Sequence, residues 1–166
     1  MISIVDYGVG NLFSLKSSFS FIGEDVVVTG DADTIRKSDK IILPGVGAFE
    51  DAAKKLRESG LGDVVIDEAK KGKPLLGICL GMQLLFEKSY EFGTHEGLGL
   101  IKGEIIPIKN VTGTLKIPHM GWNNLIFPKN KPLCPIFKNI NEGDSVYFVH
   151  SFYGSSCDES VSALAE

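Results

Sequence analysis

A cysteine lies at the centre of the segment Gly77-Ile78-Cys79-Leu80-Gly81-Met82-Gln83, which directly follows the apolar run Pro74-Leu75-Leu76. The apolar run predicts a buried strand, and the glycines two residues to either side of Cys79 allow a sharp turn into a helix. Such a turn presents a nucleophile, as in the Gly-x-Ser-x-Gly turn of hydrolases. We expect the helix to run through Leu84-Leu85-Phe86, so that its N-terminus stabilises the Cys79 thiolate. A lone cysteine is more often a buried small hydrophobe, but the paired glycines favour a nucleophile.

A second glycine-rich segment, Pro44-Gly45-Val46-Gly47, follows the predicted strand Lys40–Leu43. Because the carboxyl ends of parallel strands meet at one edge of a sheet, we expect this segment to lie near Cys79. Its glycines leave backbone N–H groups free to point at a developing oxyanion, and the N–H of Leu80 supplies a second donor. Judged alone the segment is equally well a plain loop; beside the cysteine turn it predicts an oxyanion site.

Strand and helix signals alternate through the first half of the chain. This alternation predicts an α/β fold with a parallel sheet. The predicted strands are Ile2–Val5, Val26–Thr29 and Lys40–Leu43, and the predicted helices are Asn11–Phe21, Phe49–Glu58 and Asp63–Lys71. After Gly97 the sequence pattern changes to short strand-like segments separated by Pro and Gly residues. These segments are Gly103–Ile108, Leu115–Pro118, Asn124–Phe127, Ser145–Phe152 and Ser160–Ala165. No linker or repeat divides the 166 residues, which predicts a single domain.

Composition and charge exclude several classes of function. The net charge of −4 and the lack of a Lys/Arg cluster argue against nucleic acid or a membrane as principal partner. The three cysteines show no metal-like spacing, which argues against a metal site, and the N-terminus has no basic leader, which predicts a cytoplasmic protein. Nucleotide binding is disfavoured because Phe13 stands where a Gly-x-Gly-x-x-Gly loop starting at Gly8 needs glycine.

Two histidines, His119 and His150, are of the type that serves a cysteine nucleophile as base. Neither has a carboxylate two residues further on, and spacing selects neither, so structural or ligand-contact roles are favoured for both. His95 lies in a polar run and is predicted to be a solvated loop residue. Met120 and Trp122 fit a core, but glycines and prolines nearby also allow an exposed apolar patch.

The chain resembles the class I (triad) glutamine amidotransferases from Met1 to its last residue. The resemblance rests on the two glycine-rich segments above together with Pro118-His119-Met120-Gly121-Trp122-Asn123 and His150-Ser151-Phe152. Within the family it is most similar to the glutaminase subunits that feed a cyclase making imidazole glycerol phosphate in histidine biosynthesis. The resemblance implies a three-layer αβα sandwich, a glutaminase domain over residues 1–166 and no cofactor.

The resemblance also implies roles for individual residues. Cys79 attacks the side-chain amide of glutamine, releases ammonia and forms a thioester that water cleaves. Val46 and Leu80 give the oxyanion N–H groups, and the Val46 peptide reorients when the partner is primed. Glutamine is held by Gly47, Gln83, Glu91, Ser151 and Phe152. The face that docks on the cyclase, a (β/α)8 barrel receiving ammonia through a channel, comprises Asn11, His119, Met120, Trp122 and Tyr147.

One departure from the family pattern concerns the catalytic base. The family carries His-x-Glu near its C-terminus, and this pair occurs nowhere in the 166 residues, which stop at Glu166 in a predicted strand. The 166 residues are therefore expected to be inactive, either as a fragment whose coding sequence continues to such a pair or as a non-catalytic docking subunit. The interrupted strand favours the fragment, with the His expected roughly 15–40 residues further on. A third hypothesis keeps the chemistry but supplies a synthase that amidinates a surface sugar.

Overall fold

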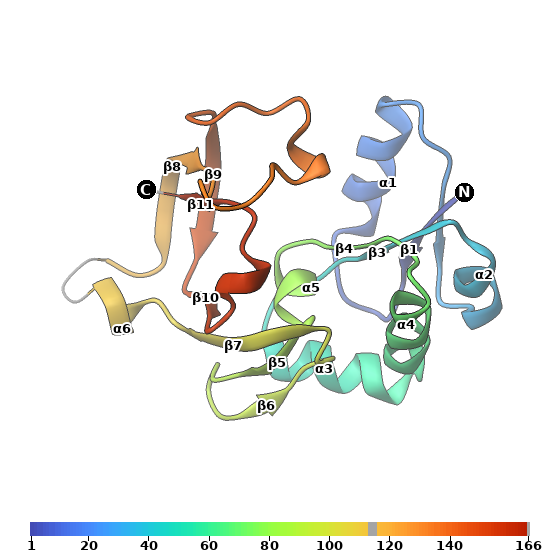
Figure 1. The fold of residues 1–166 in the computed structure, drawn as a ribbon. Coiled ribbons are helices and arrows are strands. Elements are labelled where there is room, and N and C mark those ends of the chain that lie inside the picture. The colour runs from blue at the N-terminus through green and yellow to red at the C-terminus, as the bar shows by residue number, and fades with distance from the viewer. Residues whose placement is uncertain (113–115, 166) are drawn as a thin grey trace.

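A parallel sheet of four strands forms the centre of the first half of the molecule (Figure 1). The computed structural model describes residues 1–112 and 116–165. The strands are β1 (Ile2–Val5), β2 (Val26–Thr29), β3 (Lys40–Leu43) and β4 (Leu75–Gly77), in the order β2-β1-β3-β4. Every neighbouring pair is parallel. The predicted α/β fold with a parallel sheet is confirmed.

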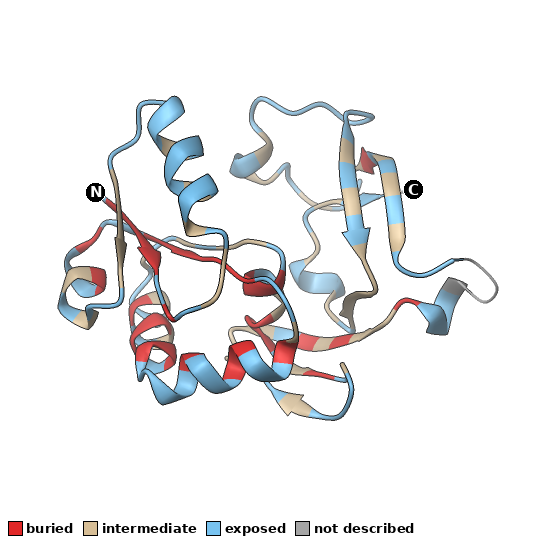
Figure 2. Cartoon of the chain, turned by 180° about the vertical axis from the view of Figure 1, so that it is seen from behind, coloured by how far each residue is buried: buried red, intermediate tan, exposed pale blue. Residues whose placement is uncertain are grey.

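Within the described residues, helices cover both faces of this sheet, with one helix on the first face and three on the second. On one face Ile4 and Ile42 pack against α1 (Leu12–Phe21), while Val5, Ile41 and Leu43 point to the other face because side chains alternate along a strand. That second face is covered by α2 (Ala32–Lys37), α3 (Phe49–Glu58) and α4 (Leu61–Lys70). Figure 2 shows buried residues on α3 and α4 and none on α1. The main core therefore lies between the sheet and α2 to α4.

The second half of the chain adds two further sheets. One has the order β10-β7-β5-β6 and consists of β5 (Phe86–Ser89), β6 (His95–Glu96), β7 (Ile101–Pro107) and β10 (Phe152–Ser155). The other is a hairpin of β8 (His119–Ile126) and β9 (Ser145–His150), extended by β11 (Leu164–Ala165). Short helical turns lie at α6 (Lys109–Thr112), η1 (Pro135–Phe137) and η2 (Asp158–Ser160). The hairpin stands to one side of the parallel sheet (Figure 1).

The helix after Cys79 is much shorter than predicted. Helix α5 spans only Leu80–Gln83, and Phe86 already begins β5. The carbonyl of Leu84 accepts a hydrogen bond from Leu98 N at 2.8 Å, and that of Leu85 accepts from Leu100 N at 2.8 Å. These carbonyls bond to a neighbouring segment instead of continuing the helix. The expectation of a helix through Phe86 is wrong, and with it the argument from a long helix behind the thiol.

Other differences also arise from contacts distant in sequence. The sequence did not predict α2, which Asp31 caps by accepting from Thr34 N at 2.8 Å. His95 is not a solvated loop residue; it lies in β6 with its side chain 15% exposed and Nε2 4.0 Å from Glu50. Leu115 of the predicted strand Leu115–Pro118 lies outside the described residues, and 116–118 are not a strand. The predicted strand Ser160–Ala165 shortens to β11.

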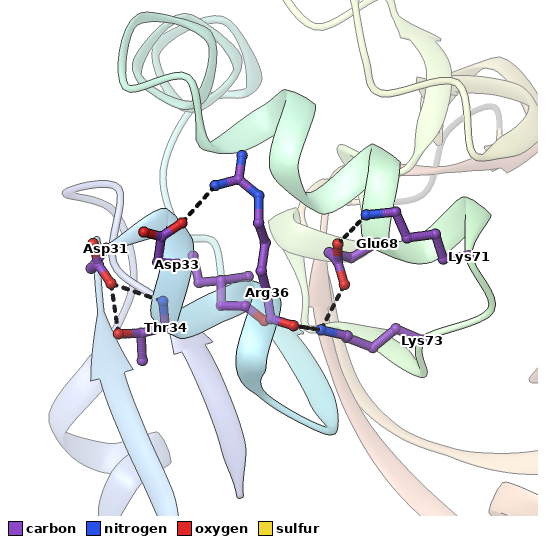
Figure 3. Close-up of polar contacts among 8 residues, drawn as sticks. Asp31, Asp33, Thr34, Arg36, Glu68, Lys71 and Lys73 are labelled. Atoms are coloured by element: carbon purple, nitrogen blue, oxygen red, sulfur yellow. Dashed lines mark hydrogen bonds and ion pairs between the residues drawn. The ribbon is translucent and has the colours of Figure 1, made fainter.

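A buried carboxylate on α4 lies at the centre of a cluster of polar contacts (Figure 3). Glu68 on α4 is 5% exposed and accepts from the ammonium groups of Lys71 and Lys73, both at 2.7 Å. Lys73 also donates to the carbonyl of Arg36 at 2.6 Å, at the end of α2. The hydrogen bonds from Lys71 and then Lys73 lower the pKa of the Glu68 carboxyl to about 2. The cluster therefore joins α4, α2 and the segment that leads into β4.

This cluster predicts a pH-dependent contribution to stability. A carboxyl whose pKa is lower in the folded state stabilises the fold above its usual pKa of 4.5, and the contribution is lost as pH falls towards 2. We expect Glu68→Gln to lower the melting temperature at pH 7, with the difference from wild type shrinking progressively below pH 4.5. The matched control is Glu58→Gln, because Glu58 is exposed and 3.9 Å from Lys54. An equal effect of both variants at pH 7 contradicts the prediction.

Candidate functional site

Cys79 occupies a strained turn between β4 and α5. Its φ of 55° and ψ of −118° lie outside the regions that L residues normally adopt, and its side chain is exposed. The turn is held by hydrogen bonds from Ile78 N to Leu43 O at 3.0 Å and from Gly81 N to Ile78 O at 2.9 Å. Backbone strain of this kind persists where surrounding contacts enforce it, and it clusters at active sites. The predicted nucleophile turn is therefore present as a local geometry.

Glycines bring this turn into direct backbone contact with the segment after β3. A Cβ on Gly81 would lie 1.9 Å from the carbonyl oxygen of Leu43, and one on Gly45 would lie 2.5 Å from Gly81 N. A Cβ on Gly77 would lie 2.6 Å from Met82 Cα. Only glycine fits at these three positions. The residues that carry the two proposed oxyanion N–H groups, Val46 and Leu80, therefore lie on segments that touch.

Two side chains anchor the Pro44–Gly47 segment. The buried hydroxyl of Tyr7 donates to the carbonyl of Pro44 at 2.7 Å, and burial raises the pKa of Tyr7, so that it remains a donor. At the other end Glu91 Oε2 accepts from Phe49 N at 2.6 Å, which caps α3 where Ala48 offers no side-chain cap. Tyr7 was not among the site residues predicted from sequence. Its position directly after β1, at the same carboxyl edge, was the available signal.

A single cavity of about 780 Å³ collects the residues expected to act on or hold glutamine. Its lining includes Val46, Gly47, Cys79, Leu80, Gln83, Glu91, Ser151 and Phe152. Val46 and Gly47 follow β3, Cys79, Leu80 and Gln83 follow β4, Glu91 follows β5, and the last two lie at the junction of β9 with β10. The size is typical of a small-molecule site. The other lining residues, among them Tyr90, Phe92 and Lys109, were not predicted from sequence to belong to this site.

The two histidines of the hairpin contact each other. His119 and His150 are cross-strand partners in β8 and β9, and His119 Nδ1 lies 2.9 Å from His150 Nε2. His150 Nδ1 lies 2.9 Å from the carbonyl oxygen of Phe152. Of the two, His150 lines the cavity that contains Cys79. Both of its ring nitrogens are engaged, so it is not placed to accept a proton from the thiol.

The residues expected to face a partner occupy three different environments. Met120, Trp122 and Tyr147 are 61%, 71% and 54% exposed, and the Trp122 and Tyr147 rings meet edge to face at 5.5 Å. His119 is half-buried on the opposite face of the hairpin. Asn11 caps α1 by accepting from Ser14 N at 3.2 Å. Only the first three form one continuous exposed apolar surface.

Within residues 1–112 and 116–165, no group of three or more His, Cys, Asp or Glu side chains is arranged to hold a metal ion. Over the same residues, the helices are too short or too polar to cross a bilayer.

Comparison with known proteins gives a consistent match over nearly the whole chain. A family model described as glutamine amidotransferase class-I matches residues 3–165. The imidazole glycerol phosphate synthase subunit HisH of Sulfurimonas denitrificans is 51% identical over 161 residues, covering 96% of this chain and 76% of that protein. The subunit of the same name from Aquifex aeolicus is 50% identical over 159 residues, covering 95% and 74%.

Solved structures of lower identity share the fold. One described as a glutamine amidotransferase superposes with a TM-score of 0.73 at 17% identity, covering 98% of this chain and 78% of that chain. PurLQS from Thermotoga maritima superposes with a TM-score of 0.62 at 24% identity, covering 91% and 66%. The arrangement of sheets and helices described above is therefore shared with these proteins.

Proposed function

Since this chain belongs to the class I glutamine amidotransferases, we propose that Cys79 is the nucleophile that attacks the side-chain amide of glutamine. Within this family the chain belongs to the HisH subunits of imidazole glycerol phosphate synthase. The observation that carries the proposal is the backbone contact between the Cys79 turn and the Pro44–Gly47 segment at the mouth of one cavity. Relatives at about half identity favour histidine biosynthesis over amidination of a surface sugar.

The chemistry follows from the atoms at this junction. The thiolate of Cys79 attacks the side-chain amide carbon of glutamine, and the resulting oxyanion accepts hydrogen bonds from the N–H groups of Val46 and Leu80. Collapse of the intermediate breaks the C–N bond, and protonated nitrogen leaves as ammonia. Water then attacks the thioester, releasing glutamate and the thiol. Backbone donors suit this step because, once the Val46 peptide has reoriented, they stabilise the oxyanion without any rearrangement of solvent.

In this proposal, glutamine is bound by residues that line the cavity together with Cys79. These are Gly47, Gln83, Glu91 and the Ser151–Phe152 backbone, and Glu91 offers a carboxylate to the ammonium of the substrate. Glu91 also accepts a hydrogen bond from Phe49 N at the start of α3, so the same carboxylate that binds the substrate also holds the end of the loop after β3. Residues 1–166 then act as one glutaminase domain, with the acid/base pair supplied from outside these residues.

The partner in this proposal is a cyclase with a (β/α)8 barrel, which receives ammonia from the cavity through a channel. Its docking surface comprises Met120, Trp122 and Tyr147, because large exposed aromatic residues are frequent anchors of protein interfaces. We further propose a cytoplasmic location, since all three cysteines are free thiols in the structure.

Selective alkylation of Cys79 tests the proposed chemistry. A chloroketone analogue of glutamine should modify Cys79 before Cys134 and Cys157, and added glutamine should protect it. Cys79 is exposed at the cavity, whereas burial and then the nearby Asp158 carboxylate raise the pKa of the Cys157 thiol. Treatment with a limiting amount of the chloroketone, followed by peptide mass spectrometry, measures the order in which the three thiols are labelled. Equal labelling of the three thiols, or no protection by glutamine, contradicts the proposal.

A second experiment tests the docking surface. We expect Trp122→Ala to weaken binding to the cyclase roughly thirtyfold, since truncating a central interface tryptophan commonly costs ~2 kcal/mol. Isothermal calorimetry measures the affinity, and the melting temperature of the isolated chain should stay unchanged because Trp122 is 71% exposed. The control is Phe21→Ala, which removes a 91% exposed aromatic from α1. Equal affinities of the two variants for the cyclase would contradict the prediction that Trp122 lies in the interface.

A further inference from the structure

We propose that His119 and His150 form a positioning pair that fixes the Ser151–Phe152 backbone of the glutamine cavity and ties it to strand β8. The pair is defined by two contacts of 2.9 Å, one between the two rings and one from His150 to the carbonyl of Phe152. The inference rests on the proposed function, because it assigns this backbone to the binding of glutamine.

Hydrogen-bond chemistry determines how protons are arranged in the pair. A carbonyl oxygen only accepts, so His150 Nδ1 must carry a proton and donate it to Phe152 O. When His150 is neutral, its Nε2 is then an acceptor, and His119 Nδ1 must be the donor across the strands. Both rings therefore adopt the Nδ1–H tautomer. The chain of donors runs in one direction, from β8 through β9 to the backbone at Phe152.

The Phe152 carbonyl has no such partner within its own sheet. In the antiparallel pairing of β10 with β7, Ile108 N donates to Ser151 O at 2.9 Å, which makes these two residues the hydrogen-bonded pair. The next pair, Phe152 with Pro107, is therefore of the non-hydrogen-bonded kind, and the Phe152 carbonyl points away from β7. Since β10 is the edge strand of its sheet, the imidazole of His150 fills the place of a neighbouring strand.

The contact of His150 with the Phe152 carbonyl lies where it can fix the position of the cavity wall. The chain leaves the β11-β8-β9 sheet at His150 and enters the β10-β7-β5-β6 sheet at Phe152, with only Ser151 between them. His150, Ser151 and Phe152 all line the cavity with Cys79. His119 secures the ring of His150 from β8, the strand whose other face exposes Met120 and Trp122. The docking surface and the glutamine backbone are therefore two sides of one hairpin.

Inactivation kinetics with the glutamine chloroketone test the pair without requiring turnover. We expect His150→Phe, which keeps a ring but removes both nitrogens, to raise the chloroketone KI roughly fivefold to tenfold, the effect of one lost hydrogen bond. His150→Asn should recover most of this loss, because its amide nitrogen replaces Nδ1 as donor to Phe152. Rates with iodoacetamide, which does not need the glutamine pocket, normalise for the intrinsic reactivity of Cys79.

Variants of His119 test the second link and keep the proposal falsifiable if His150→Phe does not fold. His119→Phe should raise KI by a smaller factor, and His119→Asn should restore it by placing an amide donor at the position of Nδ1. Unchanged KI in both phenylalanine variants overturns the proposal. So does an equal rise in the phenylalanine and asparagine variants, which would indicate a loss of packing only.

The tautomers give a readout that does not depend on the glutamine chemistry. Nitrogen-15 NMR of the imidazoles at neutral pH should show that His119 and His150 are both protonated at Nδ1. Free histidine in water, which serves as the reference, favours the tautomer protonated at Nε2. An Nε2–H form of His150 overturns the inference. A wild-type Cys79 that reacts with the chloroketone no faster than Cys134 contradicts the proposed function instead, and the NMR result then still decides whether the pair holds Phe152.

Discussion

Substituting Gly81 by alanine is expected to cost the protein at least about 3 kcal/mol of folding free energy, the upper end of the range for overpacked cores. The new Cβ would lie 1.9 Å from Leu43 O and 2.8 Å from Leu43 C, both backbone atoms of a central strand. No flexible side chain is there to move aside, so the Cys79 turn and the Pro44–Gly47 segment must separate. For a chain of this size the melting temperature should fall by roughly 6–12 °C.

A second glycine provides the matched control. Gly121 lies in β8, and a Cβ built on it meets no atom within 4 Å, so Gly121→Ala should leave the melting temperature nearly unchanged. Where Gly81→Ala still folds, its labelling by the glutamine chloroketone should also be slower than that of Gly121→Ala, since separating the two segments moves the Val46 and Leu80 amides apart. Equal melting temperatures for the two variants would mean that the tight contact does not determine stability.

The contrast between these glycines indicates which parts of the structure could be predicted from sequence. The glycines around Cys79 and at Gly45 and Gly47 are local signals, so their spacing was enough to predict the turn and the loop. The close backbone contact of Gly81 with Leu43, and of Gly45 with Gly81, joins distant segments and appears only in the structure. The strands Ile2–Val5, Val26–Thr29 and Lys40–Leu43 were likewise local apolar runs, and all three appear with the predicted bounds.

The features that could not be predicted depend on partners distant in sequence. Helix α5 ends early because Leu84 and Leu85 bond to Leu98 and Leu100, which no local propensity reveals. The same holds for Tyr7, whose hydroxyl reaches Pro44 across the sheet edge. His119 and His150 looked like two unrelated candidates because their spacing of 31 residues carries no signal, yet strand pairing places them 2.9 Å apart.

The 166 residues are expected to react once with a glutamine analogue but not to turn glutamine over, even with the cyclase present. Release of ammonia needs a proton and hydrolysis of the thioester needs an activated water, and a positioned acid/base contributes typically ~10²–10⁴ in rate. His95, His119 and His150 are the histidines of the sequence, and none is followed two residues on by Glu. His150 lines the cavity, but Phe152 O and His119 Nδ1 already engage its nitrogens.

Glutamate release in the presence of the cyclase measures this prediction, and a chimera supplies its positive control. The Sulfurimonas denitrificans subunit is matched over 76% of its length, so the segment of that relative expected to carry His-x-Glu can be fused after Glu166. The chimera should release glutamate, and a chimera carrying Cys79→Ala should not. If the 166 residues alone release glutamate at a rate that the cyclase stimulates, then His150, the hairpin histidine that lines the cavity, is the base after all. In that case His150→Asn, which keeps the donor to Phe152 but lacks a basic nitrogen, must abolish the activity, and the positioning role would give way to a catalytic one.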